Sequence, residues 1–138
     1  MCFEGKNKKP GEFSPLFKTS SKKLKLVHQS GLIRCANNKK HNSYWGCWDN
    51  PTVKRDGLNV VITDERNKII LPTKFDFPKG KWYKLPGYNA KSKSLVFTSN
   101  SSLSFGGQLK LWYGEDLVDY TTRDNHGKVC AEVFVSGG

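Results

Sequence analysis

The sequence lacks the long apolar run and the paired cysteines that would mark several classes of protein. No stretch reaches the roughly 18 apolar residues that a membrane-spanning helix needs, and the four cysteines include no C-x-x-C pair. Structural zinc sites usually draw their ligands from such closely spaced pairs. We therefore expect neither a membrane-spanning chain nor a zinc module.

The common catalytic motifs are also missing. The sequence contains no G-x-S-x-G elbow, no phosphate-binding G-x-x-x-x-G-K-[ST] loop and no H-E-x-x-H motif. His126 and Cys130 are four residues apart, which on a strand separates the two side chains too far for proton transfer. Carboxylate pairs occur in GEDLVD, but nothing in the sequence around them indicates a raised pKa. We therefore expect no enzymatic activity.

Arginine is scarce in a strongly basic chain. The formal net charge is +11, from 23 basic and 12 acidic residues, and only 4 of the basic residues are arginine. Lysine is a hydrated point charge, whereas arginine forks onto guanine edges and phosphates. This ratio favours a diffuse anionic partner, such as an acidic polysaccharide, over sequence-specific binding of nucleic acid.

The apolar residues that are present follow the two-residue period of β-strands. A chain of 138 residues is long enough for one domain, and we expect a basic N-terminal arm or edge segment at 1–22 and a single domain at 23–138. Turn-forming residues separate the alternating segments. These segments are 24–29, 58–64, 68–71, 82–85, 94–98, 107–113 and 128–135. The pattern predicts an all-β fold, an antiparallel β-sandwich or jelly roll of about eight or nine short strands.

Cysteine usage leaves two interpretations of the compartment. Four cysteines allow two disulfides in three connectivities, and Cys35 with Cys47, which flank a polar loop, is the pair that we predict. Four reduced thiols in a cytosolic protein are the alternative. A glycosylation sequon at Asn100 fits a secreted protein. We expect an extracellular protein, although this sequence shows no signal peptide.

The densest acidic cluster lies between the last two predicted strands. Carboxylates and an amide there could supply the hard oxygen ligands that calcium prefers. The candidate ligands are Glu115, Asp116, Asp119, Asp124 and Asn125. The spacing is not that of an EF-hand. A solvated turn, or pairing of this loop with the basic arm, are the alternatives.

Two aromatic clusters are candidate ligand-binding surfaces. One has Trp48, Asp49 and Asn50 with Tyr44, and the other has Trp82 and Tyr83 among lysines. Exposed rings can stack on sugars, and lysines beside them can hold sulfate, carboxylate or phosphate groups. The alternative is that the tryptophans fill the core, which we expect of at least two. Trp48 is the ring that we expect to be exposed.

The C-terminal segment resembles secreted extracellular proteins of corals and their relatives, including skeletal organic matrix proteins. The matching positions are Leu109, Leu111, Trp112, Tyr113, Gly114, Glu115, Asp116, Leu117, Asp124, Asn125, Gly127 and Cys130. The resemblance covers about residues 94–135. It implies a secreted, disulfide-tolerant β module in adhesion or matrix, and no enzyme.

Together these features predict a secreted binding module, lectin-like or of the matrix and adhesion type. Its expected ligand is carbohydrate or an acidic polymer, with calcium as the candidate cofactor. One alternative is a basic, toxin-like protein that contacts membranes peripherally, through lysines and aromatic rings. The other alternative is a non-specific nucleic-acid binder held by counterion release.

Overall fold

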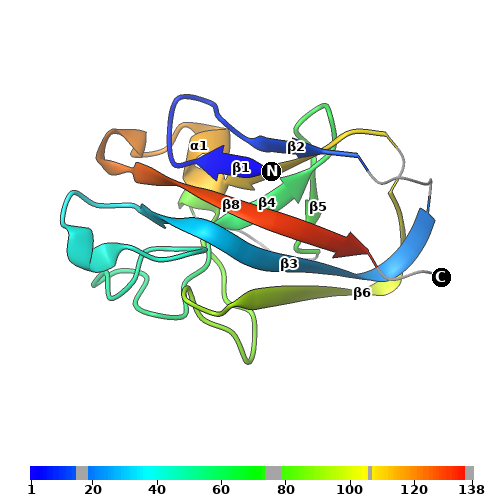
Figure 1. Cartoon of the computed structure of the whole chain (residues 1–138), viewed down its shortest axis with the longest axis horizontal. Coiled ribbons are helices and arrows are strands. Elements are labelled where there is room, and N and C mark those ends of the chain that lie inside the picture. Colours follow the sequence, from blue (N-terminus) through cyan, green and yellow to red (C-terminus); the bar gives the residue numbers. More distant parts are fainter. Residues whose placement is uncertain (15–18, 74–78, 106, 136–138) are drawn as a thin grey trace.

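The protein is a sandwich of two four-stranded antiparallel sheets. The computed structural model describes residues 1–14, 19–73, 79–105 and 107–135. The first sheet has the order β1 (Cys2–Glu4), β8 (His126–Val135), β3 (Thr19–Arg34) and β6 (Ser94–Phe105). The second has the order β2 (Gly11–Phe13), β7 (Leu109–Tyr113), β4 (Val60–Thr63) and β5 (Ile69–Leu71). Figure 1 shows the first sheet in front, with β4 and β5 behind it. The predicted all-β sandwich is confirmed.

The core lies between the two sheets and follows the alternation seen in the sequence. Leu24 and Leu26 of β3 pair with Phe97 and Leu95 of β6, and all four are buried. Such cross-strand apolar pairs stabilise a sheet through packing and removal of apolar area from water. The second sheet contributes Val60, Ile62, Leu71, Leu109, Leu111 and Tyr113 to the same cluster.

The N-terminal segment reaches an edge of each sheet. β1 pairs with β8, and β2 pairs with β7. A disulfide joins Cys2 to Cys130, its directly paired residue on β8. The boundary predicted between residues 22 and 23 falls within β3.

The second disulfide is the predicted one, between Cys35 and Cys47. It ties the end of β3 to the long loop that precedes β4. A hairpin joins β4 to β5, and Asn67 in its turn has a left-handed backbone with φ of 67°. The Asp64 side chain accepts hydrogen bonds from the backbone N–H groups of Arg66 and Lys68, which fixes the turn.

Two local predictions are wrong. Residues 82–85 form no strand, because Tyr83 makes only an isolated bridge to Leu58. All four residues of β4 are buried, where one exposed face was predicted. The remaining elements are the short helices η1 (Lys39–His41), η2 (Lys79–Lys81), α1 (Gly114–Val118) and η3 (Thr122–Asp124). Among the described residues, no helix has the length and apolar character needed to span a membrane.

Candidate functional site

The acidic segment after β7 folds into a helical turn packed on η2. Asn59, which is fully buried, joins the two elements. Its side-chain Nδ2 donates to the Gly80 carbonyl at 2.6 Å, and its Oδ1 accepts from the Glu115 backbone N–H at 3.0 Å. Gly114 allows this close approach, because a Cβ there would lie 2.8 Å from the Lys81 Cβ. The segments 80–82 and 114–121 therefore form one local unit.

Glu115 is buried at the centre of this unit, with 5% of its surface exposed. Its Oε2 accepts hydrogen bonds from the Trp82 indole N–H at 3.0 Å and from the Thr121 hydroxyl at 3.2 Å, whereas Oε1 has no partner. Burial raises the pKa of Glu115 above its usual value, and hydrogen bonds from the side chains of Trp82 and Thr121 oppose this shift. The sequence around GEDLVD gave no indication of a raised pKa, so this shift at Glu115 corrects that expectation. Protonation of this carboxylate therefore favours the native state.

Asp116 points away from Glu115 and holds the N-terminal loop. Its two carboxylate oxygens accept from the backbone N–H groups of Lys8 and Lys9, each at 2.9 Å. The Lys8 ammonium in turn donates to the carbonyls of Asp116 and Leu117, at 2.8 and 3.0 Å. Asp116 thus fixes the turn between β1 and β2, and the acidic segment contacts the N-terminal segment here through hydrogen bonds that each involve a backbone group.

The other three predicted calcium ligands have separate partners. Asp119 ends α1 in a left-handed conformation and accepts from the Thr122 hydroxyl at 3.1 Å. Asp124 is exposed and accepts from the Asn37 amide at 3.5 Å. Asn125 is fully buried and donates to the Gly5 carbonyl at 2.6 Å, which leaves its Oδ1 without a partner.

The predicted set does not converge on one point. Within the described parts of the chain, no group of three or more carboxylate, imidazole or thiol side chains is arranged to hold a metal ion. Among the side chains that the structure describes, the buried oxygens without a hydrogen-bond partner are Glu115 Oε1 and Asn125 Oδ1. Calcium binding at this segment stays a prediction. The candidate side-chain ligands are now these two oxygen atoms, and backbone carbonyls or water would have to supply the others.

An open pocket of about 350 Å³ lies on the side of Gly80, whose surroundings include Glu115. Its described lining is Gly80, Lys81, Val118 and Tyr120. Gly80 has a φ of 79°, and a Cβ added there would lie 3.0 to 3.1 Å from Tyr120, Glu115 and Trp82. The glycine thus brings the pocket wall into contact with the Glu115–Trp82 hydrogen bond. The Tyr120 and Val118 side chains are 38% and 41% exposed, so the pocket offers an aromatic and an aliphatic surface to a ligand.

The structure gives internal roles to three of the predicted aromatic residues. Tyr44 stacks on His28 with ring centroids 3.6 Å apart. Tyr83 is buried, and its hydroxyl donates to the Val60 carbonyl. Trp82 is half-buried and orients Glu115. Trp45 and Trp112 are buried in the core, which confirms that core packing takes at least two tryptophans.

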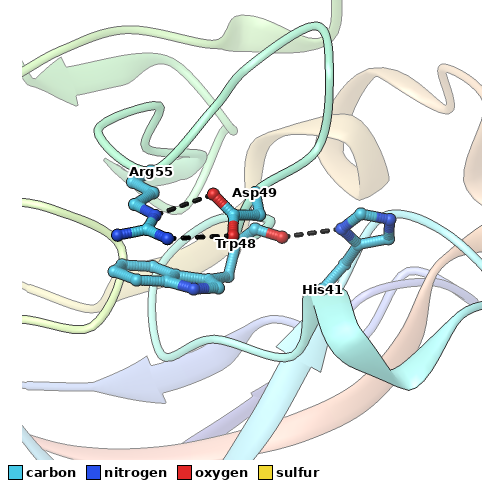
Figure 2. A network of polar contacts seen from close by, with 4 residues as sticks. All are labelled: His41, Trp48, Asp49 and Arg55. Carbon is cyan, nitrogen blue, oxygen red and sulfur yellow. Dashed lines mark hydrogen bonds and ion pairs between the residues drawn. The ribbon is translucent and has the colours of Figure 1, made fainter.

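The other predicted aromatic cluster, around Trp48, lies in the loop that precedes β4. Trp48 is partly exposed, and its ring lies under the Arg55 guanidinium, 4.9 Å from the ring centroid (Figure 2). Asp49 pairs with Arg55 at 2.7 Å. The Asn50 side chain accepts from the Thr52 backbone N–H and so shapes the loop. The predicted ring is therefore at the surface, but it is already covered in part by a cation.

Sequence reasoning missed two residues of this site, Asn59 and Tyr120. Asn59 interrupts the apolar segment LNVVITD at a position assigned to the polar face. A buried asparagine needs several hydrogen-bond partners, so a polar residue inside an apolar strand is the signal that could have found it. Tyr120 follows the acidic run and carries no comparable signal.

A disulfide-bonded β-sandwich with an open pocket beside an exposed aromatic ring has the form of a binding module. Comparison with proteins of known structure narrows this class to one family. The structure resembles AJLec from the sea anemone Anthopleura japonica, with a TM-score of 0.91 and 37% sequence identity over 99% of this chain and 92% of that chain. The chain therefore belongs to the family of AJLec, a sea anemone lectin. No protein-family model and no curated protein matches the chain.

Membership of this family tests the predictions on enzymatic activity, on the resemblance to coral proteins and on secretion. A lectin is a non-enzymatic protein, which confirms the expected lack of enzymatic activity. The cnidarian part of the sequence resemblance is confirmed, and the skeletal-matrix part stays a prediction. The two disulfides together with cnidarian lectin homology are consistent with a secreted protein.

Proposed function

We propose that the protein is a secreted lectin that binds carbohydrate in the pocket formed by Gly80, Lys81, Val118 and Tyr120. The observation that carries the proposal is the exposed Tyr120 ring at a pocket in contact with the Glu115–Trp82 pair. Protein sites for sugars combine an apolar ring with a few fixed polar groups. Kinship with a sea anemone lectin supports the same ligand class.

Replacing Tyr120 by alanine is expected to weaken sugar binding about tenfold or more, because the stacking surface is lost. An array of neutral and sulfated glycans identifies the ligand, and titration calorimetry then compares the variant with the wild type. Phe134→Ala is the matched control, since Phe134 on β8 is also an exposed ring, 51% exposed. It should bind as the wild type does.

The array also separates the other candidate functions. Equal binding by Tyr120→Ala and the wild type would move the site elsewhere, and no binding to any glycan would refute the lectin assignment. Anionic vesicles and random-sequence DNA at physiological salt test the membrane-surface and nucleic-acid alternatives, which stay predictions. Retention on heparin alone does not decide, because a net charge of +11 binds any polyanion at low salt.

Calcium is the cofactor that we propose for this pocket, at Glu115. Calcium is expected to raise the melting temperature and chelator to reverse the rise, because a ligand bound by the native state alone stabilises it. Glu115→Gln keeps the size of the side chain and removes its charge, so it should abolish the calcium response. An unchanged melting temperature of the wild type at millimolar calcium would remove the metal from the proposal.

A further inference from the structure

Trp48 carries two cations on its ring. The Arg55 guanidinium carbon lies 4.9 Å from the ring centroid, and the Lys91 ammonium nitrogen lies 4.3 Å from it. Figure 2 shows the guanidinium lying along the indole, with the Asp49 carboxylate turned toward it. Both distances are within the range of cation–π attraction. The indole therefore contacts two positive groups that come from different loops.

Backbone contacts build this arrangement. The Trp48 carbonyl accepts from the His41 ring at 2.6 Å, on the side of the loop away from Arg55 (Figure 2). Cys47, the residue before Trp48, is fixed by its disulfide to Cys35. The Arg55 carbonyl accepts from the Ala90 backbone N–H at 2.9 Å, which places the following residue, Lys91, next to Arg55. The two cations are thus positioned by the fold.

Their hydrogen-bonding capacity is only partly used. Arg55 donates through Nε and Nη2 to the two oxygens of Asp49, at 2.7 and 3.2 Å, and a guanidinium has three further N–H groups. This pairing lowers the pKa of Asp49 and keeps its carboxylate ionised. Lys91 is exposed and forms no ion pair with any residue that the structure describes. One carboxylate therefore faces two cations, which leaves a net positive charge.

The occupied ring also limits the kind of ligand. A sugar or base that stacks on the face covered by Arg55 would have to displace a guanidinium held by Asp49. An anionic group that accepts hydrogen bonds from the cations needs no such displacement. It can form charge-assisted hydrogen bonds with both Arg55 and Lys91. Sulfate esters suit this geometry, since each presents several acceptor oxygens to N–H donors.

We propose that Trp48, Arg55 and Lys91 form a subsite for sulfate groups on a polysaccharide. This subsite deepens the proposed carbohydrate-binding function and uses different residues from the pocket at Tyr120. Both cations contact the same indole, so that a chain with sulfates along its length can engage both. The ligand class of the whole protein would then be sulfated glycans.

Lys91→Ala is expected to weaken binding of a heparin octasaccharide about fivefold or more at 0.15 M salt, measured by titration calorimetry. Lys25→Ala is the matched control, because Lys25 on β3 is also an exposed lysine and its loss lowers the net charge equally. It should change the affinity less than twofold. Lys91→Arg should restore most of the binding, and desulfated octasaccharide should not distinguish wild type from Lys91→Ala.

Equal losses in Lys91→Ala and Lys25→Ala would overturn the subsite, because they would show attraction by diffuse charge. Equal losses of heparin and of a DNA oligonucleotide of matched charge in Lys91→Ala would overturn the preference for sulfated sugar. If the Tyr120 pocket does not bind carbohydrate, the result differs. Neutral glycans would then bind neither the wild type nor Tyr120→Ala, while Lys91→Ala would still weaken heparin binding. Circular dichroism confirms that each variant is folded.

Discussion

Replacing Cys2 and Cys130 together by alanine is expected to lower the free energy of unfolding by about 4 to 5 kcal/mol, the largest single effect in the protein. The disulfide joins residues 128 positions apart, so it restricts the unfolded chain over almost its whole length, and the loss of chain entropy grows with the size of the closed loop. Guanidinium denaturation under non-reducing conditions measures the difference.

The second disulfide provides the control. Cys35 and Cys47 are only 12 positions apart, and replacing both by alanine is expected to cost about 3 kcal/mol. A larger loss for this pair than for Cys2 and Cys130 would contradict the explanation by loop size. It would show instead that the bond at Cys47 stabilises the native Trp48 loop directly.

Asn59→Ala is expected to lower the free energy of unfolding by about 3 kcal/mol and sugar affinity about tenfold. The substitution leaves the Gly80 carbonyl and the Glu115 N–H without their buried partner, and each unsatisfied group costs roughly 1 to 3 kcal/mol. It also frees the two segments that form the pocket walls to move apart. Denaturation and glycan titration, the latter well below the melting temperature, measure the two effects.

Asn125→Ala is the comparison for this prediction. Asn125 is equally buried, but its side chain bonds one backbone group, the Gly5 carbonyl. Its replacement should therefore cost about half as much stability. If the two variants lose the same stability, the number of backbone partners does not determine the effect. A stable Asn59→Ala that binds sugar normally would show that Asn59 does not organise the pocket.

Periodicity predicted six of the eight strands and missed β1 and β2, although it covered only residues 24–29 of β3 and 94–98 of β6. β3 and β8 bury alternate residues against the core, a pattern that even one sequence displays. β1 and β2 are three residues each and are held by partners about a hundred positions away, so no local signal marks them. Residues 82–85 have the composition of a strand, but their backbone pairing is an isolated bridge between Tyr83 and Leu58, and the Trp82 and Tyr83 side chains add further hydrogen bonds.

The candidate site was predicted in composition but not in geometry. The acidic cluster was expected to act together, yet the five-residue helix α1 turns Glu115 toward Trp82 and Asp116 toward Lys8. A helix this short has too few residues to show a 3.6-residue period. The surface position of Trp48 was predicted, and the cations on its ring come from residues 7 and 43 positions later in the sequence.

The N-terminal strands β1 and β2 determine when this chain can complete its fold. Their partners, β8 and β7, are among the last strands of the chain. Contacts of such high sequence separation give a high contact order, which slows folding. During synthesis, which proceeds from the N-terminus, the first strands must wait unpaired until nearly all of the domain has left the ribosome. The closure of both sheets therefore follows the synthesis of β7 and β8, and the oxidation that links Cys2 to Cys130 belongs to the same stage.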